Sequence, residues 1–430
     1  MKAYRFLTIT LFLAALIATM TGCKYDVAEP QWDNPPVTTV AAIIDSIVPA
    51  QATAGVNIIT IYGKNFAGAL DTSVIHNATT KRDTNIVYNS VFFNGVPADI
   101  AEYSSTRLKV YRPNLVVNSC KVLIAPDRAL VAGGYSYGTI TSVCERMPGF
   151  ASNQLLSTIS VDKTENLYMF MARIGGKQIV KVSANNVITA DTISRTKTNS
   201  PTDARIGPDG NLYFFGYSST GLGVKDIYVY NVQTGIVGGL LTLWFSYPGG
   251  TKYFKFGDFD ASGYLYIGGL SSDVAIIAPS HASSKLSGLY ATASILAIRT
   301  AKVNNNEYLY VAAQAGVNIS IWRHTISAGG ILGPQELVLD WSTTGQFASR
   351  TIKNIAISPD GTLFIGTDAV SNPILIVNAD GINLFYKNIL PPYCPYFGWG
   401  SGNYMYMISG NTSAAQEWTV YKVDMGTKAH

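Results

Sequence analysis

A short pattern of apolar and polar positions recurs six times in the last two thirds of the chain. Each copy has an apolar run, a polar turn and a second run built on Leu-Tyr or a close relative, as in ISVDKTENLYMF from Ile159 and IAISPDGTLFIGT from Ile355. Two such runs around a tight turn predict a β-hairpin. The positions on which the six copies align are Leu167, Leu212, Leu265, Leu309, Leu363 and Met405.

The spacing of these positions predicts how the hairpins are assembled. The copies are 45, 53, 44, 54 and 42 residues apart. A period in the forties is typical of a β-propeller, because one four-stranded blade cannot bury both of its faces alone. We therefore predict a six-bladed β-propeller over residues 147–430, in which each blade runs from inner strand A through strands B and C to strand D. The repeats resemble the NHL family of six-bladed propellers. The Leu-Tyr pairs are expected in the core between blades.

Residues 40–142 carry the alternating apolar runs and turn residues of a small β-sandwich. The start Ile47-Val48-Pro49, the run ITIYGKNF from Ile59 and the hairpin Phe93-Asn94-Gly95-Val96 resemble an IPT/TIG domain. This resemblance implies an immunoglobulin-like module that acts as a spacer, with residues 69–88 as an exposed insertion. The fold class expected for the whole chain is all-β, an immunoglobulin-like sandwich followed by a six-bladed β-propeller.

Residues 1–23 have the pattern of a secretory signal. Lys2 and Arg5 precede an apolar stretch of about 15 residues, which is short for a membrane-spanning helix. The ending Met20-Thr21-Gly22-Cys23 resembles the lipobox of bacterial lipoproteins, which implies lipidation of Cys23. Residues 24–39 are polar and contain prolines, so we interpret them as a tether. The stretch KYDVAEPQWDNPPV after Cys23 resembles the surface-export tail of outer-membrane lipoproteins, which implies a lipid-anchored outer-membrane protein that faces the cell exterior.

The remaining cysteines are Cys120, Cys144 and Cys394, with no Cys-x-x-Cys among them. This odd number disfavours both a disulfide scaffold and a zinc site. We expect buried free thiols and leave a Cys120–Cys144 bridge open.

Composition and charge exclude some classes of function. Only 13% of the residues are charged, while 26 tyrosines and 39 glycines are present, which favours many short strands. The net charge is +4, or +2 without Lys2 and Arg5, and no basic run exceeds two residues. We therefore expect no nucleic-acid partner.

The sequence offers little catalytic chemistry. The propeller histidines His281, His324 and His430 share no repeat position, and the chain has no Gly-x-Ser-x-Gly, His-Glu-x-x-His or P-loop motif. We predict no catalytic residue, no metal site and no cofactor. Arg205, Arg299, Arg350 and Lys353 lie in or just before predicted A strands, where they are interpreted as solvated strand ends or as holders of an anionic group at the channel mouth.

Aromatic residues gather instead in the long loops of one propeller face, interleaved with Ser, Thr, Asn and Gly. Such rings stack on the C–H faces of sugars, while amides and hydroxyls bind sugar hydroxyls. The predicted ligand-binding residues are Trp341, Trp399, Tyr393, Tyr396, Tyr247, Tyr253 and Phe347.

The order of anchor, sandwich and propeller resembles the accessory lipoproteins of outer-membrane glycan importers. It implies a non-catalytic protein whose partners are a polysaccharide or oligosaccharide and an outer-membrane importer complex. The alternatives are a propeller hydrolase or lyase acting on a sugar or lactone, and a scaffold that contacts another surface protein.

Overall fold

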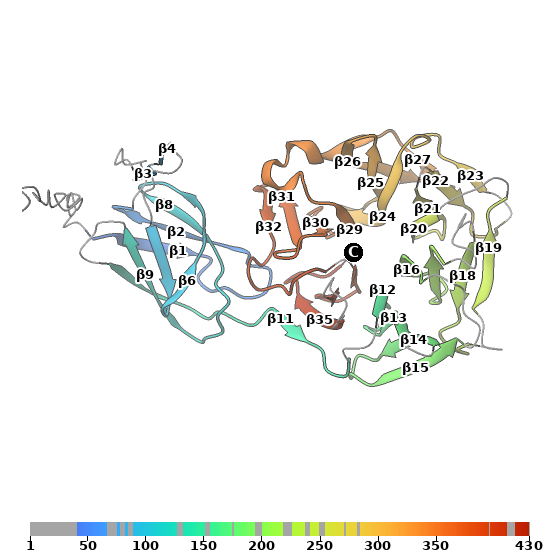
Figure 1. Cartoon of the computed structure of the whole chain (residues 1–430), viewed down its shortest axis with the longest axis horizontal. Coiled ribbons are helices and arrows are strands. Elements are labelled where there is room, and N and C mark those ends of the chain that lie inside the picture. Colours follow the sequence, from blue (N-terminus) through green and yellow to red (C-terminus); the bar gives the residue numbers. More distant parts are fainter. Residues whose placement is uncertain are drawn as a thin grey trace, which may run out of the picture.

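The protein is an all-β chain whose two domains lie side by side along its longest axis (Figure 1). The computed structural model describes residues 41–66, 75–77, 82–84, 89–126, 132–150, 155–173, 176–193, 200–217, 226–236, 241–248, 254–270, 272–281, 284–394, 396–410 and 418–429. Cys23 and the predicted leader and tether lie outside these residues. Within the described ranges, no helix has the length and apolar character needed to cross a membrane.

The first domain is a sandwich of two four-stranded antiparallel sheets. One sheet has the order β1 (Ile43–Val48), β2 (Ile58–Lys64), β8 (Arg107–Tyr111) and β7 (Ile100–Tyr103). The other has the order β10 (Gly133–Tyr137), β9 (Cys120–Pro126), β5 (Asn89–Phe93) and β6 (Val96–Ala98). Within the predicted insertion, β3 (Ile75–Asn77) pairs with β4 (Arg82–Thr84) as a separate hairpin.

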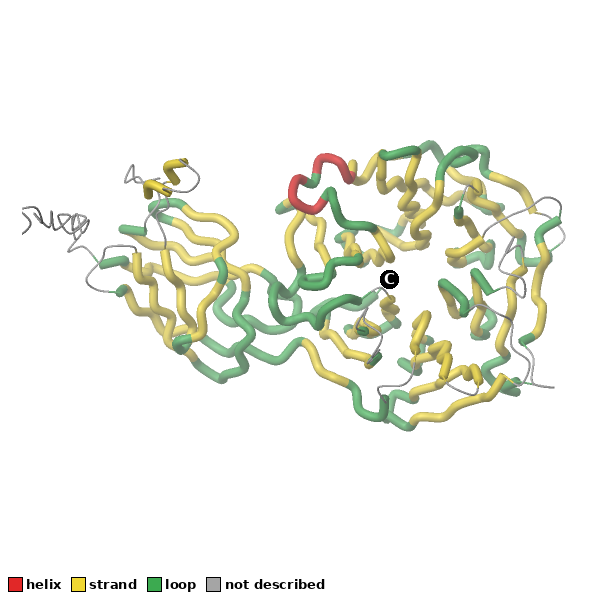
Figure 2. The backbone as a smooth tube through the Cα atoms, viewed as in Figure 1, coloured by secondary structure: helices red, strands yellow, loops and turns green. Residues whose placement is uncertain are grey.

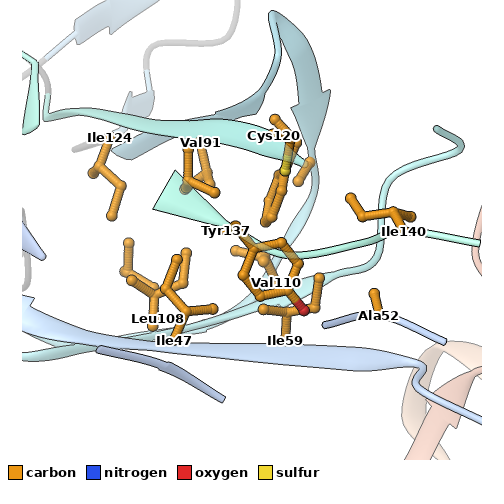
Figure 3. Close-up of a cluster of buried hydrophobic side chains, with 14 of the residues drawn as sticks. Ile47, Ala52, Ile59, Val91, Leu108, Val110, Cys120, Ile124, Tyr137 and Ile140 are labelled. Carbon is orange, nitrogen blue, oxygen red and sulfur yellow. The ribbon is translucent and has the colours of Figure 1, made fainter. Parts of the chain in front are cut away.

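The core of this sandwich is filled by alternate residues of both sheets (Figure 3). Ile59 and Ile61 of β2 are fully buried, and so are Val122 and Ile124 of β9. The residues between them are more exposed, so the burial has the period of two that the sequence pattern predicted.

The second domain is a ring of six sheets (Figure 2). Blade one contains β12 (Leu155–Val161), β13 (Leu167–Arg173), β14 (Gly176–Val182) and β15 (Ile188–Ile193). Blade two contains β16 (Asp203–Ile206), β17 (Leu212–Phe215), β18 (Asp226–Tyr230) and β19 (Thr242–Ser246). Blade three contains β20 (Phe254–Phe259), β21 (Leu265–Gly269), β22 (Ser272–Ile277) and β23 (Ser284–Leu286). Blade four contains β24 (Ser294–Val303), β25 (Asn306–Ala315), β26 (Asn318–Ser327), β27 (Ile331–Leu332) and β28 (Glu336–Asp340). Blade five contains β29 (Ile352–Ile357), β30 (Leu363–Thr367), β31 (Ile374–Asn378) and β32 (Gly381–Leu384).

Blade six closes the ring with strands from both ends of the domain. Its order is β33 (Tyr396–Trp399), β34 (Tyr404–Ser409), β35 (Thr419–Asp424) and β11 (Cys144–Arg146). The inner strand of blade one, β12, contacts both β16 and β33. The propeller therefore begins at β11, three residues before the predicted boundary at residue 147, because a strand from before blade one completes the last sheet.

The six aligned positions of the repeat all lie in the second strand of a blade, and all are fully buried. The tyrosines of the Leu-Tyr pairs are also buried, as predicted. In blades one to three, the aspartate of the preceding turn satisfies the tyrosine hydroxyl: Tyr168 donates to Asp162 at 3.2 Å, Tyr213 to Asp209 at 2.9 Å and Tyr266 to Asp260 at 3.0 Å. These three repeats thus bury a ring without leaving its hydroxyl unpaired.

The sandwich rests on blades five and six through a buried contact. Tyr386, which follows β32, is fully buried, and its hydroxyl accepts from Gly55 N at 2.7 Å and donates to Asp424 O at 2.9 Å. The guanidinium of Arg112 lies 5.5 Å from the centroid of the Tyr386 ring and donates to Thr141 O at 2.6 Å. The sandwich is therefore fixed against the propeller by contacts between residues far apart in the chain.

Cys120, Cys144 and Cys394 are free thiols. Cys120 and Cys394 are buried, and Cys144 is partly buried in β11. Burial raises the pKa of the Cys144 thiol to about 12, so it stays protonated at neutral pH.

Candidate functional site

Two of the aromatic residues predicted to bind ligand lie in the core instead. Trp341 is 2% exposed and Phe347 is 5% exposed. They belong to two 3-10 helices, η1 (Trp341–Thr343) and η2 (Gly345–Phe347), which are the red segment of Figure 2. The indole Nε1 of Trp341 donates to Arg350 O at 2.9 Å, so the ring can be buried without an unpaired donor. The prediction that Trp341 and Phe347 form an exposed platform is therefore wrong.

Tyr247 is also buried, at 7% exposure, and packs edge-on against Phe254 with 5.4 Å between ring centroids. It therefore belongs to the core under blades two and three rather than to an open surface. Tyr253, predicted beside it, lies outside the described residues.

Tyr393, Tyr396 and Trp399 are half-buried around the inner strand of blade six. Trp399 donates from Nε1 to Gly402 O at 3.1 Å, and its ring meets Phe364 edge-on at 5.5 Å. Tyr393 and Tyr396 pack in one apolar cluster with blade one, whereas Trp341 packs between blades four and five. The structure thus brings Tyr393 and Tyr396 together but does not join them to Trp341 in one patch.

The inner strands carry a buried network of ion pairs. Asp203 of β16 accepts from Arg299 of β24 at 3.0 Å and is paired with Arg205 at 3.2 Å. Arg299 also donates to the Asn354 side chain, whose amide donates to Phe397 O at 3.0 Å. The network thus links blades two, four, five and six. Arg299 is only 7% exposed, so it is not the solvated strand end considered from the sequence.

Two carboxylates face two guanidinium groups in this network, because Asp258 Oδ1 also lies 3.9 Å from Arg205 Nε. Burial raises the pKa of the Asp203 carboxyl to about 6, although Arg205 acts to lower it. With two guanidinium groups within 3.2 Å, we treat Asp203 as ionised at neutral pH. Because its donors and acceptors pair with one another, we interpret the network as a structural one that connects the inner strands of different blades. Within the described residues, no group of three or more His, Cys, Asp or Glu side chains is arranged to hold a metal ion.

A groove of about 510 Å³ lies where the connection before blade four meets the outer strands of that blade. Its buried lining residues, Tyr290, Ala293 and Ala313, are largely apolar, its exposed ones are both polar and apolar, and one half-buried indole, that of Trp322, lines it. Leu337, which is 55% exposed, also contributes to it. The lining residues are Leu289, Tyr290, Thr292, Ala293, Ala313, Ala315, Asn318, Ser320, Trp322, Gln335, Leu337 and Asp340. We call this feature the blade-four groove.

One wall of the blade-four groove is anchored by Asp273, a buried residue of β22. Its carboxylate accepts from Ser287 Oγ at 2.6 Å, from Tyr290 N at 2.9 Å and from Gly288 N. A carboxylate that collects several donors of one loop holds that loop in a single conformation. Asp273 therefore positions the groove wall without lining it.

The floor is anchored by His324, which is fully buried. Its Nδ1 lies 3.0 Å from Gly333 O, a pure acceptor, so we assign the proton of the neutral ring to Nδ1. Nε2 then accepts from the Tyr290 hydroxyl at 2.7 Å. Burial lowers the pKa of His324, which keeps the ring neutral and preserves this bond at neutral pH.

Trp322 was not among the predicted site residues, because those were sought in the long loops of one propeller face and Trp322 lies in a strand. The sequence did contain a signal for it. Along β26, Asn318, Ser320 and Trp322 alternate with Ile319 and Ile321, so the indole shares a face with polar side chains. A tryptophan on the polar face of a strand is a better candidate for an exposed ring than one in a loop that can fold inward.

The fold and these features define a two-domain all-β protein, an immunoglobulin-like sandwich joined to a six-bladed propeller. Residues 42–142 match the family model described as IPT/TIG domain, which confirms the resemblance read from the sequence for this part of the chain. No curated protein matches the chain.

Among solved structures, the chain is similar to a protein of unknown function from Bacteroides thetaiotaomicron. The identity is 12%, the match covers 89% of this chain and 98% of that one, and the TM-score is 0.46. It is also similar to a catalytically inactive variant of virginiamycin B lyase from Staphylococcus aureus, solved with quinupristin. There the identity is 14%, the coverage is 79% of this chain and 99% of that one, and the TM-score is 0.41. Similarities of this size say nothing about ligand or activity.

Proposed function

We propose that the protein is a non-catalytic surface protein that binds a glycan in the blade-four groove. The observation that supports this proposal is the meeting of one half-buried indole with neutral hydrogen-bonding side chains on a single concave surface. An indole buries the apolar face of a sugar ring, and amides and hydroxyls both donate to and accept from sugar hydroxyls. Asn318, Ser320 and Gln335 supply those groups around Trp322.

The groove also has the rigidity that recognition requires. Asp273 fixes its loop wall and His324 fixes Tyr290 in its floor. Because these side chains are held before a ligand arrives, little conformational entropy is lost on binding. A loop face whose rings turn inward, as Trp341 does, offers no exposed ring on which a sugar could stack.

Glycan titration against Trp322 variants tests the proposed site. The full chain in detergent micelles is screened against neutral and acidic polysaccharides by affinity electrophoresis, and any binder is then measured by calorimetry. Trp322→Ala should weaken binding by about ten- to hundredfold, since a lost stacking platform costs about 1–3 kcal/mol. Trp322→Phe should retain part of the affinity.

Trp244→Ala is the matched control, because Trp244 is a half-buried indole on blade two, away from the groove. Equal effects of Trp322→Ala and Trp244→Ala on binding would place the site elsewhere. If none of the polysaccharides retards the full chain in affinity electrophoresis, glycan binding is refuted.

We further propose that Cys23 carries a lipid that holds the protein at the outer membrane, facing outward beside a glycan importer. The support is the leader and its Met20-Thr21-Gly22-Cys23 ending. Cells expressing Cys23→Ala should incorporate no labelled fatty acid into the protein and should release it from the membrane fraction. Protease accessibility on intact cells tests the outward orientation. Membrane retention of Cys23→Ala at the level of the natural protein would refute the anchor.

A further inference from the structure

Resting on the glycan-binding role proposed for the same site, we infer that the blade-four groove takes uncharged glycans and discriminates against acidic ones. Among the described residues, no lysine, arginine or histidine lines the groove, and the one charged residue in its lining is the carboxylate Asp340. An acidic sugar would therefore lose its hydration without gaining a cation and would lie near a like charge.

The carboxylate of Asp340 is held in place at the end of β28. Its Oδ1 accepts from Ser342 N at 2.9 Å and from Ser342 Oγ at 2.7 Å. In the sheet, Asp340 lies opposite Ser320, two residues from Trp322 on the same strand face. A ligand stacked on the indole would therefore lie close to this fixed negative charge.

The cationic residue of β26 next to Trp322 is Arg323, and its guanidinium group contacts residues outside the groove. Arg323 follows Trp322 and so projects from the opposite face of the strand. Its Nε lies 2.7 Å from Glu336 Oε2, and its guanidinium lies 4.9 Å from the centroid of the Tyr308 ring. Since Arg323 is already paired, it offers no counter-charge to a uronate or sulfate in the groove.

The neutral groups match uncharged sugars instead. Thr292, Asn318, Ser320 and Gln335 can each both donate and accept a hydrogen bond. Recognition by such groups and by stacking depends little on ionic strength, because no ion pair is formed. Charge selectivity and salt independence are therefore two separate consequences of the same lining.

Affinity electrophoresis of the full chain tests the inference with named probes. The neutral probes are pullulan, galactomannan, arabinogalactan and mixed-linkage β-glucan, and the acidic probes are polygalacturonate, alginate, hyaluronan and chondroitin sulfate. We expect at least one neutral probe to bind at least about tenfold more tightly than any acidic probe, which corresponds to about 1.4 kcal/mol. Between about 0.05 and about 0.5 M salt, its affinity should change less than about twofold.

Asp340→Asn keeps the side-chain shape and removes the charge, so it should raise the affinity for acidic probes and leave that for neutral probes unchanged. Thermal melts check that the variant is folded. Tight binding of an acidic probe that is lost in Trp322→Ala would overturn the inference while leaving glycan binding in the groove intact. If none of the eight probes binds, the proposed function itself is overturned.

Discussion

Asn57 of the sandwich pairs with the backbone around Tyr386 of the propeller in the way that one strand pairs with another. Its Oδ1 accepts from Tyr386 N at 2.7 Å, and its Nδ2 donates to Leu384 O at 2.9 Å. Lys387 extends the contact through an ion pair with Asp99 at 2.7 Å. The first domain is therefore joined to the second by buried, directional bonds, which a freely pivoting spacer would not need.

Replacing Asn57 should loosen this junction. Asn57→Ala leaves one buried donor and one buried acceptor without partners, which costs about 1–3 kcal/mol for each unpaired group. We expect a lower melting temperature and faster proteolysis between the domains, measured by calorimetry and limited trypsin digestion. Asn118→Ala removes an exposed asparagine of the same domain and is the control. If both variants melt alike, Asn57 does not couple the domains.

The strand β11 should be required for a stable ring. Cys144, Glu145 and Arg146 pair with β35, Met147 N donates to Val420 O at 2.8 Å, and Asp424 N donates to Val143 O at 2.8 Å. A fragment of residues 147–430 loses this pairing and exposes the edge of β35. Its melting midpoint, followed by circular dichroism, should lie at least about 4 °C below that of a fragment of residues 143–430. Identical midpoints would show that β11 contributes nothing.

Trp341→Ala should destabilise the protein without a direct effect on the blade-four groove. Removing a fully buried indole leaves a cavity between blades four and five, at a cost of about 3–5 kcal/mol. Urea denaturation measures this loss. Trp341→Phe keeps most of the volume and should cost less, although it leaves Arg350 O without its donor. If Trp341→Ala is as stable as the natural protein but does not bind glycan, the initial prediction that Trp341 binds ligand would be supported instead.

His324 should make stability depend on pH. Because burial lowers its pKa in the folded state, the unfolded chain binds the proton more readily. The stabilisation is complete above the unfolded pKa of about 6.5 and is lost as the pH falls below it, by at most about 1.4 kcal/mol per pH unit. Hydrogen bonding to the backbone of Gly333 and Pro334, and the charge of Glu336, oppose part of this lowering of the pKa.

Urea midpoints at pH 5 and pH 7.5 for the natural protein and for His324→Gln measure this contribution. The variant should be less stable at pH 7.5 but should vary less between the two values. His281→Gln, which removes an exposed histidine, is the control. An unchanged pH dependence in His324→Gln would exclude this residue as its source.

Much of the architecture followed from the sequence alone. Leu167 and its five counterparts predicted where each blade has its second strand, because strand alternation and turn residues act over a few neighbouring positions. The hairpin at Asn94-Gly95 also depends only on neighbouring residues, and it occurs in the structure. The burial of the Leu-Tyr pairs follows as well, since a repeat that stacks must bury its repeated rings.

The tertiary structure alone decided which rings and charges face one another. Trp322 lies in blade four and Trp341 in the connection that follows it, yet Trp341 is buried between blades four and five while Trp322 lines an open groove. The pairing of Asp203 with Arg299 joins residues 96 positions apart, and the pairing of β11 with β35 joins the two ends of the propeller. Local periodicity assigns a residue to one face of a strand, but it does not say what covers that face. That depends on the packing of segments distant in the chain, which is why the fold could be predicted here while the groove could not.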